Sequence, residues 1–212
     1  MMSDPGDHHP LWLGTTPLVL ASQSKTRFDL LIAAGIPTEV VPAHIDERGI
    51  SDLLVTKGCS PQQIAGNLAA EKARAVSKTL PERVVLGADQ VLACDGTMLH
   101  KPTDHQSAAA QISFLSGKTH YLHSAINVSI NSSPVTSFVE TAKLKMRVLS
   151  SDTIEKYLSA TGAAVFTSVG SYQLERLGIH LFDRISGDHT TILGLPMVTL
   201  LNRLRTLHLV VE

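Results

Sequence analysis

The stretch LVLASQSKTRFDLLIAAG, residues 18–35, contains a strand, a polar turn and a helix in immediate succession. The apolar run at 18–21 ends in polar residues, which is typical of a buried strand. Apolar residues then recur at helical spacing from Phe28, with Ser24 as a suitable N-cap and Gly35 at the end of the helix. A strand that turns directly into a helix is typical of an α/β protein.

The rest of the chain alternates between the same two patterns, without an internal repeat, a linker or a low-complexity segment. We therefore expect an α/β fold in which helices flank a mixed sheet. A single domain at 18–212 would follow a loose N-terminal tail at 1–17. Ser60, Thr103 and Ser151 are the expected N-caps of three later helices. A strand that runs into a polar loop is predicted at 38–47, and further strands at 83–94, 118–130 and 137–149. Further helices are predicted at 60–80, 103–117, 150–162 and 196–207.

The composition is that of an ordinary globular protein, with 43% hydrophobic and 17% charged residues and a net charge of −1. This charge does not favour nucleic acid or an acidic membrane as a partner. Cys59 and Cys94 form no CxxC pair, which favours a reducing compartment. The chain starts without a basic segment ahead of an apolar one, and no apolar run reaches ~18 residues. We expect a soluble, cytoplasmic protein.

The tetrapeptide SGKT at 116–119 resembles the end of a phosphate-binding P-loop. A P-loop needs another glycine five residues before Gly117, where this chain has Ile112, and it runs from a strand into a helix. Here the order of the two elements is reversed. Gly117 is therefore predicted to end a helix, with Lys118 close to its C-terminal dipole.

Polar and basic side chains occupy the turn between the first strand and the first helix. Ser22, Ser24, Lys25 and Arg27 lie where free N–H groups and the helix dipole favour an anion. Hydroxyl and guanidinium groups would add directed donors. The alternative is a helix cap with solvated charges.

Asp89 interrupts the apolar strand VVLGADQV. Burial of a carboxylate costs several kcal/mol unless it is paired or binds a metal, so its position suggests a metal ligand or a general base. The small residues Gly87 and Ala88 leave the approach to it open. The alternative is a surface aspartate at the end of a strand.

Several segments together, in order and spacing, resemble the Maf family of nucleoside triphosphate pyrophosphatases over about residues 18–208. They are LVLASQSKTRFDLLIAAGI, HIDE, LAAEKARAV, VVLGADQV, LHKP, LSGKTH, SVGSYQLERLG and ILGLP. The resemblance implies a fold similar to Maf and ITPase proteins, with two lobes around a central cleft. It also implies a hydrolase that cleaves between the α and β phosphates, with Mg²⁺, or alternatively Mn²⁺, as the cofactor.

The resemblance also assigns residues. Ser22 and Arg27 match the phosphate loop, and Ser24 belongs to the same turn. Asp89 matches the catalytic acid, which could orient the attacking water directly or through the metal. The residues that match the metal-associated acid and the two phosphate-facing lysines are Glu47, Lys72 and Lys101.

Some positions depart from the usual family pattern. Lys25 and Thr26 replace a proline and an arginine, so one guanidinium is lost and Lys25 is expected to restore part of its charge. Gln90 and Glu175 resemble the branch that acts on 7-methyl-GTP, and both are predicted to bind the base. A carboxylate accepts N–H bonds from a guanine edge and favours a cationic base. Arg176 stands where a glycine is usual.

The expected substrate is therefore a modified nucleotide such as 7-methyl-GTP, with a house-cleaning role implied by the family. One alternative is dTTP, UTP or broad specificity, and another is a nucleotide-binding regulator without turnover. A homodimer is an open alternative to a monomer. The ten histidines are scattered and do not favour a histidine metal site.

Overall fold

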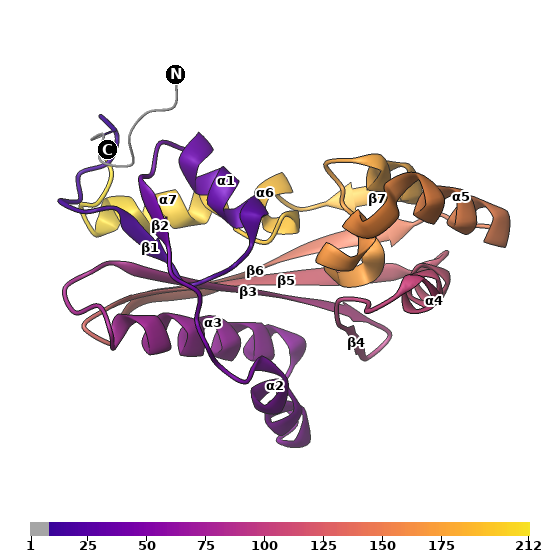
Figure 1. Cartoon of the computed structure of the whole chain (residues 1–212), viewed down its shortest axis with the longest axis horizontal. Helices are drawn as coiled ribbons and strands as arrows, with labels where there is room; N and C mark the ends of the chain where they lie inside the picture. Colours follow the sequence, from indigo (N-terminus) through magenta and orange to yellow (C-terminus); the bar gives the residue numbers. More distant parts are fainter. Residues whose placement is uncertain (1–8) are drawn as a thin grey trace. The chain divides into compact units, whose positions relative to one another are not determined.

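The computed structural model describes residues 9–212, whose strands form one mixed sheet in the order β2-β1-β3-β5-β6-β7, with β4 paired to β3 (Figure 1). This confirms the predicted mixed α/β fold class. No helix in these residues is long and apolar enough to cross a membrane. The strands are β1 (Leu18–Leu20), β2 (Thr38–Val40), β3 (Val85–Cys94), β4 (Thr97–Leu99), β5 (Thr119–Ile130), β6 (Ser133–Met146) and β7 (Phe182–Ser186).

The chain divides into two compact units. Unit 1 comprises the residues up to Gln90, Ser124–Glu140 and His189–Glu212. Unit 2 comprises Val91–His123 and Thr141–Asp188. The expected cleft between two lobes stays a prediction.

Unit 1 begins with the strand, turn and helix that the sequence predicts. Strand β1 is completely buried and runs parallel to both β2 and β3. Helix α1 (Lys25–Ala33) starts directly after the turn, and its N-cap Ser24 accepts a hydrogen bond from the N–H of Arg27. Because β1 and β3 are parallel, residues that follow β1 lie beside the middle of the longer β3.

The other helices of unit 1 are α2 (Glu47–Thr56), α3 (Pro61–Ser77), α6 (His189–Ile192) and α7 (Met197–Thr206). Helix α3 has the predicted N-cap Ser60, in a reciprocal capping box with Gln63. Helix α2 was not predicted, because HIDE suggested only a polar loop. The side chain of Asp46 accepts from the N–H of Gly49 and so caps a helix that begins at Glu47.

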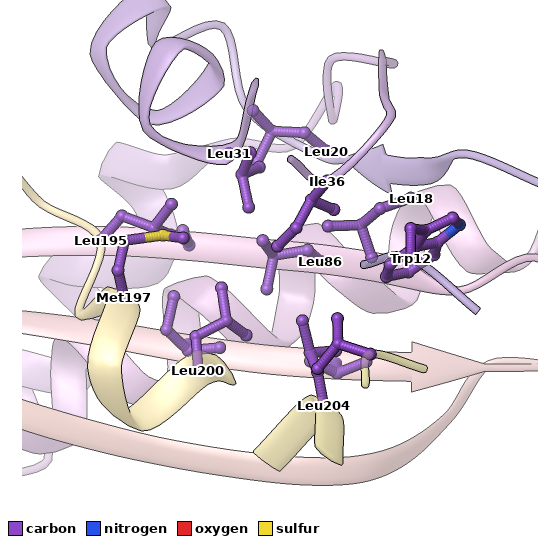
Figure 2. Packing of buried hydrophobic residues seen from close by; sticks show 14 residues of the cluster. Trp12, Leu18, Leu20, Leu31, Ile36, Leu86, Leu195, Met197, Leu200 and Leu204 are labelled. Carbon is purple, nitrogen blue, oxygen red and sulfur yellow. The ribbon is translucent and has the colours of Figure 1, made fainter. Parts of the chain in front are cut away.

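The hydrophobic core of unit 1 brings together residues from both ends of the chain (Figure 2). Trp12 is only 4% exposed, and it forms an isolated bridge with Val210. The predicted loose tail at 1–17 is therefore wrong for this part, because burial of the indole ring outweighs the entropy of ordering the segment. Residues 1–8 of that prediction lie outside the described residues.

Helix α3 packs unusually close to strand β3. A Cβ atom on Gly87 would lie 2.1 Å from the carbonyl oxygen of Ala69 and 2.7 Å from the amide nitrogen of Ala73. Real Cβ atoms do not approach backbone so closely, so only glycine fits at 87. This close packing brings the side chains of α3 within reach of the residues that follow Gly87 in β3.

Unit 2 contains α4 (His105–Leu115), α5 (Ser151–Thr161), the 3-10 segments η1 (Gly162–Thr167), η2 (Val169–Ser171) and η3 (Leu177–Leu181), and β7, which pairs antiparallel with β6.

The two N-caps expected for the helices of unit 2 were each wrong by one residue. Asp104 caps α4 instead of Thr103, and Ser150 caps α5 instead of Ser151. Gly117 follows α4 with a φ of 70°, which confirms the helix end and excludes a P-loop at SGKT.

Candidate active site

The turn after β1 carries two serines that shape the start of helix α1. Ser22 is 8% exposed, and its Oγ lies 3.3 Å from the amide nitrogen of Ser24. Ser24 caps the helix, as predicted. The first turn of a helix offers N–H groups and the positive end of its dipole to an anion. This geometry is compatible with the phosphate-binding role of the turn, which stays a prediction.

Arg27 lies half-buried beside this turn and is held by three hydrogen bonds. Its Nη1 donates to Ser22 Oγ (3.0 Å) and to the carbonyl oxygen of Ala88 (2.9 Å), and its Nε donates to the carbonyl oxygen of Gly194 (2.9 Å). The group Nη2 makes no hydrogen bond with residues 9–212 and keeps two N–H donors for a ligand. Burial lowers the pKa of Arg27, and the charges of Asp89 and Glu47 oppose this shift.

Lys72 joins the two predicted acids. Its Nζ lies 2.7 Å from Asp89 Oδ1 and 2.8 Å from Glu47 Oε2. The side chains of Lys72 and Asp89 are only 8% and 10% exposed, whereas that of Glu47 is 52% exposed. Lys72 comes from α3, Asp89 from β3 and Glu47 from the first residue of α2, so three separate elements build this cluster.

Asp89 is therefore a buried, paired carboxylate and not a surface residue. Its Oδ1 accepts from Lys72, while its Oδ2 makes no hydrogen bond with the described part of the chain. An ionised carboxylate oxygen in such a position can accept a proton or a water O–H. The role of Asp89 as a general base stays a prediction, with which its burial and its pairing to Lys72 are compatible.

The carboxylates of Glu47 and Asp89 also fit a divalent metal. Within residues 9–212 no three His, Cys, Asp or Glu side chains lie together as a complete metal site. Mg²⁺ does not require one, because it usually binds to one or two carboxylates together with substrate phosphates and water. Two carboxylates converge on Lys72, so the donor set fits a metal that arrives with a polyphosphate.

Gln90 points to the opposite side of β3 from Asp89, as adjacent residues of a strand do. Its Nε2 donates to Ser124 Oγ (2.9 Å) and to the carbonyl oxygens of Thr191 (3.2 Å) and Ile192 (2.9 Å). The predicted base-binding role of Gln90 stays a prediction, and these occupied donors do not favour it.

Two predicted site residues belong to unit 2. Lys101 and Glu175 are both exposed. Their roles towards phosphate and base stay predictions. Lys25, expected to replace part of a lost charge, instead pairs with Asp29 at 2.7 Å with its side chain 85% exposed.

The two carbonyl groups that accept hydrogen bonds from Arg27 were not predicted from the sequence. Main-chain oxygens carry no residue signature, so the roles of Ala88 and Gly194 could only be seen in the fold. Gly194 lies in the segment ILGLP and has a φ of 93°, which is a conformation that favours glycine. Ser124, which connects Gln90 with Thr191, also lacked a recognisable motif.

The chain is similar to known proteins over most of its length. The family model described as Maf-like protein matches residues 17–207. A nucleoside triphosphate pyrophosphatase of Rhodopseudomonas palustris strain BisB18 is 53% identical, covering 92% of this chain and 96% of that protein. A protein of the same name from Nitrobacter winogradskyi is 52% identical, with the same coverage of each chain.

Two further matches are more distant. A 7-methyl-GTP pyrophosphatase of Rhizobium etli is 44% identical over 91% of this chain and 97% of that protein. A HAM1 protein of Coxiella burnetii has 16% identity and a TM-score of 0.41, covering 61% of this chain and 72% of the other. The family model spans most of the chain, and these three pyrophosphatase relatives each cover more than 90% of it. This chain belongs to the Maf-like family.

Proposed function

We propose that this protein is a nucleoside triphosphate pyrophosphatase, which hydrolyses its substrate to the monophosphate and pyrophosphate. The observation that carries the proposal is the buried Lys72–Asp89 pair beside Arg27 and the start of α1. These groups lie after or within the parallel strands β1 and β3, in the region of an α/β sheet where ligands usually bind. The names of the relatives at about 50% identity support the same activity.

A triphosphate needs several cations to bind it. Arg27 offers its two remaining Nη2 N–H groups, and Ser22, Ser24 and the first turn of α1 offer neutral donors. Lys72 supplies a charge next to the carboxylates. We propose Lys101 as a further phosphate-binding cation, because it matches the corresponding family lysine.

Asp89 is the proposed general base. Its Oδ2 accepts a proton from a water molecule while that water's oxygen forms a bond to the α-phosphorus. The bond between this phosphorus and the oxygen bridging to the β-phosphate breaks, and pyrophosphate leaves with the electron pair. Lys72 holds Oδ1 and so orients the carboxylate, while Arg27 stabilises the charge that develops on the phosphate oxygens.

Glu47 and Asp89 would hold the divalent metal. When bound, Mg²⁺ would neutralise phosphate charge and polarise the phosphorus–oxygen bonds. The support for this proposal is the pair of carboxylates on one side of Lys72 and the preference of Mg²⁺ for such oxygen ligands.

The proposed substrate is 7-methyl-GTP or a related modified purine nucleotide. Glu175 is an exposed carboxylate that could accept hydrogen bonds from a guanine edge and favour a cationic base. The relative from Rhizobium etli that is named a 7-methyl-GTP pyrophosphatase supports this choice. Cytoplasmic location is also proposed, since both cysteines, Cys59 and Cys94, are free thiols.

The test is pyrophosphate release from 7-methyl-GTP, GTP, dTTP, UTP and CTP in the presence of Mg²⁺, and separately of Mn²⁺. Release that is largest with 7-methyl-GTP would support both the reaction and the substrate. A preference for dTTP or UTP would keep the reaction and reject the substrate. Binding without release from any nucleotide would instead indicate a regulator without turnover.

A further inference from the structure

One face of the sheet in unit 2 carries an exposed aromatic ring and basic side chains from neighbouring strands. Strand β6 lies between β5 and β7 in the sheet. On β5, the ring of Tyr121 is nearly parallel to that of His123, with 8° between the planes and 6.2 Å between the centroids. His123 Nδ1 lies 2.8 Å from Thr141 Oγ1 on β6. These three side chains therefore share one face of the sheet.

The alternation of side chains along β6 extends this face. Successive residues of a strand point to opposite faces, so Lys143 and Lys145 lie on the same face as Thr141. The residues between them, Ala142 and Leu144, are completely buried on the other face. The hydrophobic core of unit 2 thus lies behind β6, and the two lysines lie in front of it.

Strand β7 adds a third cation to the same face. Its register places Arg184 directly opposite Lys145 and Ser186 directly opposite Lys143. Lys143 and Arg184 are exposed, and Lys145 is half-buried. We call this surface the basic face; it consists of Tyr121, Thr141, Lys143, Lys145, Arg184 and Ser186.

The three cations of the basic face lack acidic partners. Within residues 9–212 none of them forms an ion pair, and Lys145 donates only to the carbonyl oxygen of Gly117. Like charges directly opposite each other on neighbouring strands are destabilising. The arrangement of Lys145 and Arg184 is therefore unfavourable for the fold, and an anionic ligand would explain it.

A purely structural explanation accounts for only part of this surface. Charges on an edge strand discourage pairing with another sheet, and β7 is an edge of this sheet, which would account for Arg184. The same argument does not apply to Lys143 and Lys145, because β6 is paired on both sides at these positions. Nor does it explain Tyr121, whose ring is 39% exposed.

We propose that the basic face binds single-stranded nucleic acid. An exposed aromatic ring on a sheet can stack on an unpaired base, and cations beside it can contact the phosphates. In a duplex the bases stack on one another, so their faces are not open to Tyr121. The net charge of −1 predicts no general attraction to nucleic acid, but this face alone carries three cations. The proposal goes beyond the proposed pyrophosphatase function and does not rest on it.

The test is fluorescence anisotropy with a labelled oligouridylate of about 12 nucleotides, measured over a series of salt concentrations. The oligonucleotide has a 5′-hydroxyl end, so it offers no triphosphate to hydrolyse. Tyr121→Ala should weaken binding about tenfold, whereas Tyr121→Phe keeps the ring and should stay within about twofold of the parent. Lys143→Gln and Arg184→Gln should each weaken binding and reduce the slope of log affinity against log salt by about 0.7.

Lys156→Gln is the matched control, because it removes an exposed cation of the same unit that pairs with Asp152. It should leave the affinity for the oligonucleotide unchanged. If Tyr121→Ala does not fold, the charge variants Lys143→Gln and Arg184→Gln provide the test. Both should release pyrophosphate from mononucleotides at the parent rate. If the parent releases none, the proposed function fails while oligonucleotide binding still decides this proposal.

Three results would overturn the proposal. The first is no binding of the oligonucleotide by the parent protein at about 50 mM salt, where phosphate contacts are strong. The second is equal affinity for the single strand and for a duplex, unchanged by Tyr121→Ala, which would indicate unspecific attraction of anions. The third is self-association of Arg184→Gln with unchanged oligonucleotide affinity, which would mean that the charge only protects the edge of the sheet.

Discussion

The two units bury polar side chains of opposite character. Unit 1 buries a charged pair, Lys72 and Asp89, whose side chains are 8% and 10% exposed. Unit 2 buries His120, whose Nε2 lies 2.8 Å from the hydroxyl of Tyr172, with Phe182 packed against both rings. Burial lowers the pKa of His120 to about 4 and raises that of Tyr172, so both are neutral near pH 7.

The cost of burial differs between the neutral pair of unit 2 and the ion pair of unit 1. A neutral pair of rings can be buried at modest cost and adds packing as well as a hydrogen bond. A buried ion pair often contributes no more stability than apolar residues of similar size would. The charges of unit 1 are therefore better explained by a ligand than by stability, whereas the rings of unit 2 are explained by packing alone.

The largest expected effect is that of Asp89→Asn on activity. The amide keeps the shape of the side chain but cannot accept a proton from water, so kcat for pyrophosphate release should fall by about 10³-fold. Pyrophosphate release measured under saturating substrate checks this. Asp52→Asn on α2 is the control and should retain full activity. A loss below fivefold for Asp89→Asn would show that this carboxylate is not the base.

Lys72→Met tests the cost of the buried charge directly. It leaves Asp89 buried without its closest partner, so the free energy of unfolding should fall by about 3 kcal/mol in urea denaturation near pH 7. Arg74→Met on the same helix breaks an exposed ion pair with Glu71 and should cost less than about 1 kcal/mol. Equal losses in the two variants would contradict the distinction between a buried and an exposed ion pair.

His120 should make the stability of the protein depend on pH. The pKa of His120 in the folded protein, about 4, lies below the ordinary value of 6.5. The contribution of His120 to the free energy of unfolding is therefore fully present above pH 6.5. That contribution is lost as the pH falls to about 4, because in this range only the unfolded chain binds the proton. The free energy of unfolding should change by about 3 kcal/mol in total. Burial also lowers the pKa of His123, which acts in the same direction.

The measurement compares the unfolding free energy of the parent protein and His120→Gln between pH 7 and pH 4. Glutamine can keep a hydrogen bond to Tyr172 but does not titrate, so the variant should lose less stability on acidification. Parallel pH profiles would mean that His120 becomes protonated without unfolding the protein, and the neutral interior proposed for unit 2 would be wrong.

Glu175→Gln tests the predicted base recognition in unit 2. An amide replaces one acceptor by a donor and removes the charge, so kcat/KM for 7-methyl-GTP relative to UTP should fall about tenfold. The nucleotide panel measures this ratio. Glu155→Gln, an exposed position of α5 with its side chain 60% exposed, should not change it. An unchanged ratio for Glu175→Gln would remove this residue from the base site.

Lys25→Ala should have the smallest effect. Its ammonium pairs with Asp29 one helical turn away, and both side chains are exposed, so stability should change by less than about 0.5 kcal/mol. Because its charge is directed at Asp29, kcat/KM should stay within about twofold of the parent value. A tenfold loss would show instead that Lys25 turns towards the phosphate when a nucleotide binds.

Local patterns in the sequence predicted much of the fold and the types of site residue. The strand, turn and helix of 18–35, the caps Ser24 and Ser60 and the helix end at Gly117 are set by neighbouring residues, so they could be predicted. The errors at Thr103 and Ser151 arose because adjacent residues can both serve as caps, and a shift of one residue depends on backbone geometry. Helix α2 was missed because HIDE was interpreted as a polar loop, although Asp46 caps a helix that begins at Glu47.

The sequence by itself determined which residue types were available to the site, namely buried acids, a guanidinium and a lysine within an apolar helix face. Only the tertiary structure decided that Lys72 joins Asp89 to Glu47, and that Gly194 and Ala88 hold Arg27 through their carbonyl groups. The physical reason is that periodicity orients a side chain relative to its own helix or strand. The distance to its partner depends on how those elements pack. Here α3 can approach β3 closely enough only because Gly87 has no Cβ atom.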